Sequence, residues 1–374
     1  MATKPLVSIT DICCTSMKIL VALFAVTSLY AQNIVSPEVH PDRRVTFRLQ
    51  APKASEASVL FDWMPAGSKG EPMTKGSDGI FTATLGPLDP TVYVYWFNVD
   101  GLNIADPINP RVKLRARTSA SLVEVPSAQA SLWQPQDTPH GTVDINWTKS
   151  AVLNGETRWF WVYTPPGYEK DRNAKYPVLY LFHGSNDTAG GWVLAGHANF
   201  ILDNLIAQKK AVPMIVIMPW GHAVPFGSPR EIQAKNTSTY EDYLLKEVIP
   251  YVESKYRVNA DRKTRAIAGL SMGGGQSLTI GFRHPELFSS VGAFSAAVPE
   301  NMDTLLGEAK TINDKYKNIY FACGKQDSLF GRAQKLDELM TSKQIKHTFH
   351  PTEGAHNYAV WRQYLGEFAP LLFH

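Results

Sequence analysis

The sequence predicts an α/β fold, a mostly parallel sheet covered by helices on both faces, preceded by a small all-β sandwich of the immunoglobulin type. Short segments that alternate apolar and polar residues occupy the first third of the chain, as in antiparallel sheets. From about residue 141, continuous apolar strands alternate with amphipathic helices, the pattern of a parallel sheet buried on both sides. The length of 374 residues is enough for two or three domains of roughly 150 residues each.

The composition is that of an ordinary globular protein. Hydrophobic residues make up 44% of the chain and charged residues 19%, which excludes a disordered or fibrous protein. The formal net charge of +3 is too small to favour a nucleic acid or an anionic membrane as partner. Cysteine occurs only at Cys13, Cys14 and Cys323, which excludes a disulfide scaffold; without paired CxxC motifs or HExxH, no metal site is expected.

The first 31 residues predict a signal peptide. Lys18 precedes an apolar run of eight residues, and a short exit segment ends at Ala31, where we expect cleavage. The run is shorter than the roughly 18 apolar residues of a membrane-spanning helix. We therefore expect a secreted or periplasmic protein with no membrane anchor after signal removal; an uncleaved anchor is the alternative. Either Met1 or Met17 is the initiator, since the residues between them add nothing that a signal peptide needs.

Residues 33–126 predict the sandwich. Their apolar segments are short, are separated by turn residues and are not interrupted by a long helical pattern. Gly79 and Gly101 each follow an aspartate and supply the positive φ that tight hairpin turns need. We expect strands at residues 45–49, 58–61, 81–85 and 92–97.

Residues 127–140 form a polar, proline-containing linker without periodicity, as expected between domains. The second domain then spans residues 141–374. Its expected strands are 178–182, 214–218, 264–268, 290–294, 319–322 and 347–349, and its expected helices are 198–208, 239–256, 273–283, 332–343 and 357–368. Active sites of such sheets lie at the carboxyl ends of the strands.

The stretch GLSMG at residues 269–273 predicts a catalytic serine. It fits GxSxG, and it lies where a predicted strand feeds a predicted helix. The sharp turn needs small residues beside Ser271, because side chains there would collide with neighbouring backbone. Ser271 is expected to project over the edge of the sheet as a nucleophile. A helix-capping serine in a glycine-rich turn is the alternative.

A serine nucleophile needs a histidine base, and in this fold type the acid and then the histidine follow the serine along the chain. We expect His356 to be the base, because it lies in a loop between the last strand and the last helix, with His350 as the reserve. His284 ends the nucleophile's own helix, which points away from the serine. His347 and the terminal His374 are the remaining histidines after the serine.

The orienting carboxylate is predicted at Asp327. It follows the strand at residues 319–322 after a short loop, which places it at a strand's carboxyl end. Asp303 and Asp314 lack such a strand and are the weaker candidates. Helix capping ahead of Leu329 is the alternative role for Asp327.

Two backbone amides are predicted to hold the oxyanion. The Met272 amide follows the nucleophile, and the Ser185 amide lies in the loop after the strand at residues 178–182. Gly184 lets that loop approach the substrate closely and is counted with the substrate-binding residues. The preceding His183 is expected to be structural and not catalytic.

Three aromatic residues are candidates for an apolar wall around the acyl group. Trp192, Trp220 and Phe226 lie in loops or turns near the same edge of the predicted sheet, as does Met272. Packing in the core is the alternative for each of them.

Taken together, these motifs resemble carbohydrate esterase family 1, the feruloyl and acetylxylan esterases related to esterase D. The resemblance implies an α/β-hydrolase fold, a triad of Ser271, Asp327 and His356, and no cofactor. One departure is Ala355, where many relatives carry glycine before the histidine. The resemblance is carried by residues 163–168, 176–184, 269–274, 324–327 and 354–356, followed by Trp361 and Arg362.

The front block resembles an early-set, immunoglobulin-like domain of the carbohydrate-binding module family 48 type. The resemblance is carried by residues 94–101 and by the Asp-Pro pair at 106–107. It implies a structural lid or a sugar-binding module. Trp63 or Trp96 would stack on sugar rings if exposed, although core packing is the stronger expectation for Trp96, which lies inside a strand.

These expectations combine into an exported serine esterase that releases ferulate from arabinoxylan or its oligosaccharides through an acyl-enzyme. Acetylxylan deacetylation is the first alternative, because the same triad serves both reactions. An enterochelin-type siderophore esterase is another, since such enzymes join a similar front domain to this fold. An inactive carbohydrate-binding protein is the alternative outside enzymology. The oligomeric state is left open.

Overall fold

The computed structural model describes residues 34–65 and 67–374. The predicted signal peptide, its cleavage position and both candidate initiators lie outside the described residues. Residues Ser36–His374 form one compact unit. Within the described ranges, no helix combines the length and the apolar character needed to cross a bilayer.

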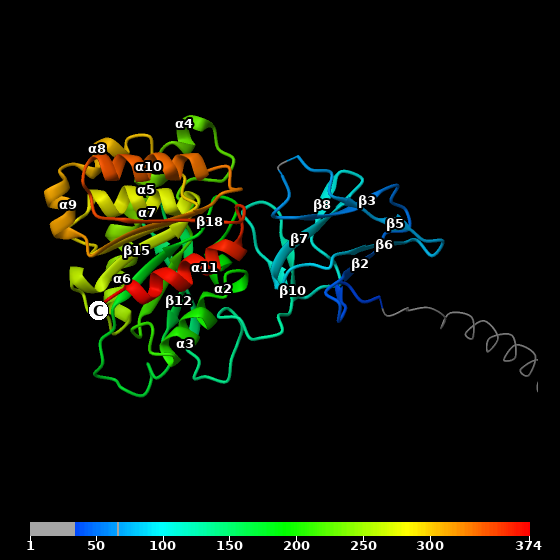
Figure 1. Cartoon of the computed structure of the whole chain (residues 1–374), viewed down its shortest axis with the longest axis horizontal. Coiled ribbons are helices and arrows are strands. Elements are labelled where there is room, and N and C mark those ends of the chain that lie inside the picture. The colour runs from blue at the N-terminus through cyan, green and yellow to red at the C-terminus, as the bar shows by residue number, and fades with distance from the viewer. Residues whose placement is uncertain (1–33, 66) are drawn as a thin grey trace, which may run out of the picture. The chain divides into compact units, whose positions relative to one another are not determined.

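The first region is all β, as predicted, and consists of two sheets (Figure 1). One sheet has the strand order β1-β2-β6-β5; the other has the order β4-β3-β7-β10-β9, with β8 paired to β7. The bounds are β1 (Glu38–Val39), β2 (Val45–Gln50), β3 (Ala57–Phe61), β4 (Glu71–Pro72), β5 (Thr74–Lys75), β6 (Ile80–Leu85), β7 (Thr91–Val99), β8 (Leu102–Ile104), β9 (Val112–Lys113) and β10 (Ala120–Val125).

The core of this region is formed by the side chains that point to the inner face of each sheet. Successive side chains of a strand point to opposite faces of its sheet, and in β3 buried and half-buried residues alternate without exception. Phe47, Phe61, Tyr95 and Phe97 fill the space between the two sheets. The other face of β3 and β7 is therefore free to contact something outside the sandwich.

The second region is built on an eight-stranded sheet with the order β11-β12-β14-β13-β15-β16-β17-β18. The six strands β13 to β18 run parallel to one another, whereas β11 and β12 form an antiparallel hairpin at one edge of the sheet. The bounds are β11 (Thr142–Ser150), β12 (Glu156–Thr164), β13 (Val178–Phe182), β14 (Ile215–Pro219), β15 (Arg265–Leu270), β16 (Ser290–Phe294), β17 (Asn318–Gly324) and β18 (Thr348–Thr352).

The mostly parallel α/β sheet is confirmed, and the six predicted strands coincide with β13 to β18. The hairpin β11–β12 is absent from the predicted strands, because polar and charged residues interrupt its apolar pattern. An edge hairpin with one exposed side does not need the continuous apolar run of a central parallel strand.

Helices cover both faces of the sheet (Figure 1). One apolar cluster joins the sheet to α5, α6, α7 and α10, and a second joins its other face to α2, α3 and α11. The bounds are α2 (Gly191–Leu194), α3 (Ala198–Ala207), α4 (Arg230–Gln233), α5 (Asn236–Tyr243), α6 (Ile249–Lys255), α7 (Met272–Arg283), α8 (Met302–Leu306), α9 (Ala309–Lys315), α10 (Phe330–Ser342) and α11 (Tyr358–Phe368), with a π-turn at Leu244–Val248 joining α5 and α6.

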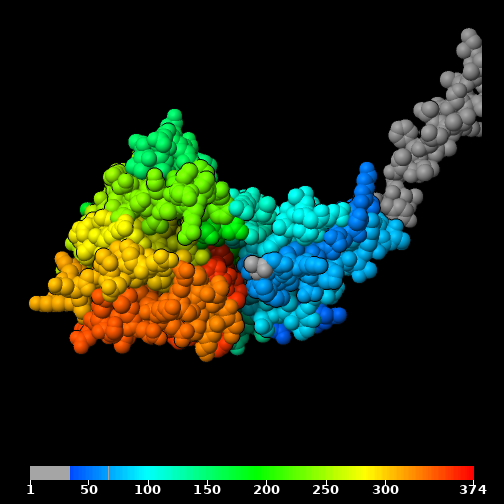
Figure 2. All heavy atoms as spheres, turned by 90° about the horizontal axis from the view of Figure 1, so that it is seen from above, coloured from blue at the N-terminus to red at the C-terminus, as the bar shows by residue number. Residues whose placement is uncertain are grey.

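The sandwich and the sheet region share one buried cluster, in which residues of β7 and β10 pack with α11. Figure 2 shows the surfaces of the two regions adjoining. The buried Arg362 of α11 donates to the Ala195 carbonyl at 2.6 Å, to the Val92 carbonyl at 3.3 Å and to the Thr91 hydroxyl. Its guanidinium also lies 5.1 Å from the Trp133 ring centre. One side chain thus bonds to both regions and packs against the segment between them.

We predict that Arg362→Met lowers the free energy of unfolding by about 2–4 kcal/mol, because hydrogen bonds from a charged donor contribute about 1.5–3 kcal/mol each and the carbonyls lose their partner in a buried place. Urea unfolding of the two proteins measures this difference in the free energy of unfolding. The control is Arg111→Met, which removes an exposed ion pair to Glu124 and is expected to cost less than about 1 kcal/mol. Equal losses in the two variants would contradict the role given to Arg362.

Candidate active site

Ser271 occupies a strained turn between β15 and α7. Its backbone has φ 54° and ψ −116°, a conformation that a non-glycine residue adopts only where its surroundings enforce it. A Cβ on Gly269 would lie 2.5 Å from the Gly273 carbonyl group, and a Cβ on Gly273 would lie 2.5 Å from the His183 carbonyl oxygen. Both glycines are therefore required by the close approach of strand, turn and helix.

The three residues of the predicted triad form one hydrogen-bonded chain. His356 Nε2 lies 2.9 Å from Ser271 Oγ, and His356 Nδ1 lies 2.7 Å from Asp327 Oδ2. The Trp361 ring stands perpendicular to the imidazole, with 4.9 Å between ring centres. If Nδ1 carries the proton that Asp327 accepts, Nε2 is left free to accept the serine proton.

Asp327 follows β17, as expected, and its side chain is buried. Burial alone raises the pKa of this carboxyl, but the hydrogen bond and charge of His356 and the Leu329 amide outweigh it, so the pKa lies below its ordinary value. The Leu329 amide donates to Asp327 Oδ1 at 2.9 Å. The capping interaction and the contact with His356 thus coexist, one on each carboxylate oxygen.

The two amides predicted to hold an oxyanion are available. Gly184, Ser185 and Ser271 line one cavity, and Met272 is the first residue of α7. Among the described residues, neither the Ser185 nor the Met272 amide donates a hydrogen bond to a protein acceptor. A Cβ on Gly184 would lie 2.8 Å from Leu270 Cδ1 and 3.3 Å from Ser271 Cβ, so glycine lets this loop approach the nucleophile turn.

His183 holds the loop from beneath. Its Nδ1 donates to the Gly184 carbonyl at 2.8 Å, and its Nε2 accepts from the Gly221 amide at 2.8 Å. Burial lowers the pKa of His183 to about 4. A neutral ring is what this arrangement needs, since a protonated Nε2 would face another donor.

A buried carboxylate that sequence reasoning missed connects the sandwich to this site. Asp187 lies two residues after Ser185; its Oδ2 accepts from the Tyr358 hydroxyl at 2.6 Å and lies 3.0 Å from Lys113 Nζ. Lys113 belongs to β9 of the sandwich, and Tyr358 follows two residues after His356. Asp187 therefore ties the sandwich to both loops that carry the proposed chemistry. The individual residues carry no motif, so only the tertiary structure reveals the connection.

The predicted aromatic wall is wrong for Trp192. Its ring is fully buried, its Nε1 donates to the Phe182 carbonyl at 2.9 Å, and it packs edge-on against Phe294 and Tyr358. A large apolar ring in a short helix beneath the loop contributes to the core instead of facing a substrate.

The other two aromatic residues do not line the cavity that holds Ser271 either. Trp220 stacks on Trp159 with ring centres 4.3 Å apart, and the Arg158 guanidinium lies 4.5 Å from the centre of the Trp220 ring. Phe226 packs edge-on against His222, beneath the Arg117 guanidinium. Both rings have protein partners that the sequence pattern could not show.

The reserve candidates are engaged elsewhere. His350 lies 2.6 Å from Glu367, His347 lies 2.9 Å from Asp337, and Asp303 pairs with Lys343. Across residues 34–65 and 67–374, no three His, Cys, Asp or Glu side chains are grouped so that they could hold a metal ion.

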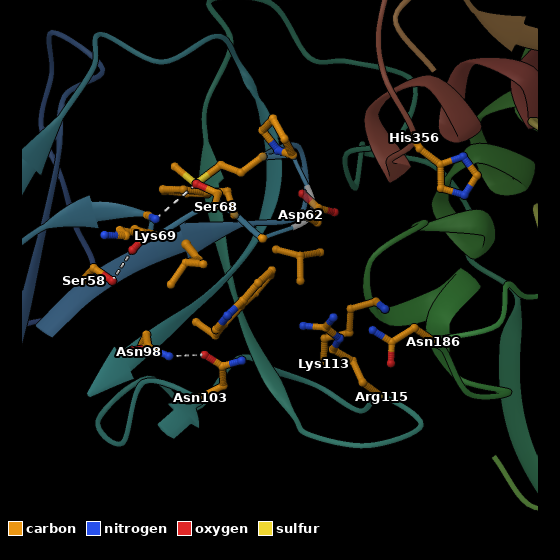
Figure 3. Close-up of a pocket in the computed structure, with 18 of the residues that line it drawn as sticks. Ser58, Asp62, Ser68, Lys69, Asn98, Asn103, Lys113, Arg115, Asn186 and His356 are labelled. Atoms are coloured by element: carbon orange, nitrogen blue, oxygen red, sulfur yellow. Dashed lines mark hydrogen bonds between the residues drawn. The ribbon is translucent and has the colours of Figure 1, made fainter. Parts of the chain in front are cut away.

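The cavity has a volume of about 1160 Å³ and is lined by both regions of the chain. Ser271, His356, Tyr358 and Trp361 line one end. Strands β3 and β7 of the sandwich line the other, and Figure 3 shows Asp62, Lys113 and Arg115 on that side facing Asn186 and His356. The sequence did offer a signal for the side of the cavity formed by the sandwich, namely the polar residues that alternate with core residues along β3 and β7.

The chain was compared with known proteins. The model of the family described as putative esterase matches residues 150–371. An endo-1,4-beta-xylanase/feruloyl esterase of Xylanibacter ruminicola is 32% identical over 349 residues, covering 90% of this chain and 46% of that protein. An acetyl esterase of Caldicellulosiruptor saccharolyticus is 22% identical over 234 residues, covering 53% of this chain and 84% of that protein. The chain spans about half the length of the first of these relatives.

Solved structures resemble it as well. A ferulic acid esterase, 29% identical, covers 62% of this chain and 97% of its own with a TM-score of 0.52. The enterobactin esterase of Shigella flexneri, 17% identical, covers 87% of this chain and 92% of its own with a TM-score of 0.64. At that identity the second likeness shows the fold alone.

We predict that His183 makes stability depend on pH. Because the ordinary pKa of histidine is 6.5 and that of His183 in the folded protein is about 4, the unfolded chain takes up a proton below pH 6.5 that the folded protein does not. Stability is therefore complete above about pH 6.5 and falls towards pH 4, by about 2–3 kcal/mol at pH 4.5. The stability advantage of the protein over its His183→Gln variant should shrink by this amount between pH 7 and 4.5 in urea unfolding; a constant difference would contradict the prediction.

Proposed function

The chain belongs to the putative esterase family and is a carboxylic ester hydrolase, and on that premise we propose that it is an exported serine esterase acting on hydroxycinnamoyl esters of plant cell-wall polysaccharide. The preferred substrate is a feruloyl ester of arabinoxylan or of its oligosaccharides. Export is supported by the basic residue and apolar run near the N-terminus of the sequence.

The observation that carries the proposal is the hydrogen-bonded chain from Ser271 through His356 to Asp327. Two backbone amides without a protein acceptor accompany it, that of Ser185 in the cavity lining and that of Met272 directly after the nucleophile. A serine hydroxyl is a weak nucleophile unless an adjacent base removes its proton. A buried carboxylate that orients the base, and donors aimed at a developing oxyanion, complete the requirements for acyl transfer.

In the proposed reaction, Ser271 Oγ attacks the ester carbonyl while its proton passes to His356 Nε2. The amides of Met272 and Ser185 stabilise the negative oxygen of the tetrahedral intermediate, a contribution of about 3–4 kcal/mol for one donor in comparable sites. His356 Nε2 then gives this proton to the ester oxygen of the sugar as the bond between that oxygen and the acyl carbon breaks, so that the sugar leaves with a free hydroxyl and the acyl group stays on Ser271. Water, activated by the same imidazole, hydrolyses the acyl-enzyme and restores Ser271, while Asp327 stabilises the imidazolium at both stages.

The similarity to proteins described as feruloyl or ferulic acid esterases supports the choice of acyl group. The cavity volume of about 1160 Å³ also favours a substrate larger than an acetyl ester, since pockets of about 300–1,000 Å³ accommodate drug-sized ligands. Acetylxylan remains the alternative substrate, supported by the likeness to an acetyl esterase.

We predict that Ser271→Ala lowers kcat on methyl ferulate by at least about 10³-fold, because the nucleophile is lost while the fold is kept. The control is Ser254→Ala, which changes an exposed serine of α6 and should retain activity within about twofold. Undiminished hydrolysis by purified Ser271→Ala protein would refute the proposed nucleophile.

A panel of methyl ferulate, methyl coumarate, acetylated xylan and a catecholate trilactone then identifies the acyl group. The proposal requires the highest kcat/KM on the hydroxycinnamates. A preference for acetylated xylan or the trilactone would reassign the substrate, and inactivity on all four and on a simple aryl acetate would indicate a binding protein.

A further inference from the structure

The outer edge of β11 is an unpaired strand edge. Among the described residues, no backbone group outside the hairpin β11–β12 bonds to the backbone of β11. Alternate residues of an edge strand direct their N–H and C=O groups away from the sheet, so such a strand is a template for pairing with another strand. The nine residues of β11 (Thr142–Ser150) form a long template that contains no proline.

The other sheet edges in the described part of the chain are protected. The opposite edge of the same sheet is β18, which has five residues and contains Pro351. In the sandwich, β1, β4, β5 and β9 have two residues each, and β8 has three. Short edge strands and prolines are the devices by which proteins prevent pairing between edges. Because β11 has neither device, its edge is open to a partner strand.

Two large apolar side chains of β11 lie beside this open edge. Ile145 is 48% exposed and Trp147 is 62% exposed, and their spacing of two residues places them on one face of the sheet. The Trp147 ring packs on Trp159 of β12, with 5.2 Å between ring centres. Asn146, between them, lies on the other face and bonds to two tyrosine hydroxyls. Exposed apolar side chains next to free backbone groups mark an interaction surface.

The sequence of β11 is complementary to itself. In a two-fold symmetric antiparallel pair centred on Asn146, Ile145 of each copy lies opposite Trp147 of the other, so the exposed apolar side chains of both copies meet near the axis. The remaining pairs bring no like charges together; they are Asp144 with Thr148, Val143 with Lys149, and Thr142 with Ser150. The formal net charge of +3 adds little repulsion between two copies.

We propose that β11 pairs antiparallel with β11 of a second copy of this chain, about a two-fold axis at Asn146, so that the eight-stranded sheets of the two copies become continuous. A second copy is the occupant because the strand itself supplies both sides of every contact. The catalytic residues follow β15, β17 and β18, which are separated from β11 by other strands of the sheet. The pairing therefore does not involve them, and the inference does not depend on which ester is hydrolysed.

Analytical ultracentrifugation of the purified protein tests the pairing. The mass should be twice that of one chain at micromolar concentration, and Trp147→Lys should raise the dissociation constant at least about tenfold, because tryptophans buried at an interface contribute strongly to binding. The control is Leu102→Lys, which changes a 66% exposed apolar residue of β8 and should leave the constant within about twofold. A monomer at every concentration up to about 100 µM, or a dimer that Trp147→Lys does not weaken, would overturn the proposal.

Activity shows that the variant is folded. Trp147 does not line the cavity that holds Ser271, so Trp147→Lys should hydrolyse an aryl acetate within about twofold of the unaltered protein. Two double variants then test the contact between Ile145 and Trp147. Ile145→Glu/Trp147→Lys places opposite charges across the axis and should dimerise at least about tenfold more tightly than Ile145→Lys/Trp147→Lys, which places like charges there. Equal dissociation constants for the two double variants would contradict the proposed register.

A single cysteine tests the register independently. Position 146 alone lies opposite itself, with Cα atoms about 4.5–5.5 Å apart, which is within disulfide range. In a background of Cys13→Ser and Cys14→Ser, which leaves the buried Cys323, Asn146→Cys should form a cross-linked dimer on oxidation. The matched control is Thr148→Cys, whose two copies lie about 13 Å apart along the strands and should not cross-link. Equal cross-linking of both variants, or none in Asn146→Cys, would overturn the pairing.

The other possible occupant of this surface is a polysaccharide, since an exposed indole ring can pack against a sugar. Retention on insoluble arabinoxylan distinguishes the two occupants. A dimer whose retention is unchanged in Trp147→Ala supports the second copy. A monomer whose retention is lost in Trp147→Ala would assign the surface to a polysaccharide and overturn the proposal.

Discussion

The site depends on the close approach of three backbone segments around Ser271. The strand β15, the turn and the start of α7 leave no space for a Cβ at Gly269 or Gly273, and the serine is held at φ 54°. The loop after β13 also approaches this turn closely, since a Cβ on Gly184 would lie 2.8 Å from Leu270 Cδ1. This packing places the hydroxyl at the carboxyl edge of the sheet, where the loops after β17 and β18 bring a carboxylate and an imidazole to it. The strain of one residue is thus offset by the stability of the sheet and of both its helical layers.

A second constraint joins the sandwich to the chemistry. Arg362 bonds β7 to the α/β region, and Lys113 of the sandwich pairs with Asp187, which also receives the Tyr358 hydroxyl. These groups are buried, so their hydrogen bonds and charges act in a medium that weakens them little. The sandwich is therefore a wall of the active-site cavity whose position is fixed by polar contacts, and Trp96 belongs to the part of it that faces Ser271's cavity.

The sequence predicted what depends on local pattern and chain order. The strand–turn–helix around Ser271, the strand end before Asp327 and the last loop around His356 are each defined by short stretches of sequence, and the sheet brings strand ends together at one edge. The predictions failed where distant packing decides. Trp192 was expected beside the substrate, but the sequence alone does not show whether the ring of a residue near a loop faces the cavity or packs into the core beneath the loop. Asp187 has no motif, because its importance comes from partners more than seventy residues away on the sandwich side and far along the chain.

The central claim is that Ser271 is the group that forms the covalent bond to the acyl carbon. Reaction of the intact protein with an aryl fluorophosphonate, followed by peptide mass spectrometry, tests it most directly, because such reagents phosphonylate only an activated hydroxyl. The account predicts that one equivalent abolishes ester hydrolysis and that the added mass lies on Ser271. Inactivation with the added mass on another residue, or full activity after modification of Ser271, would contradict it.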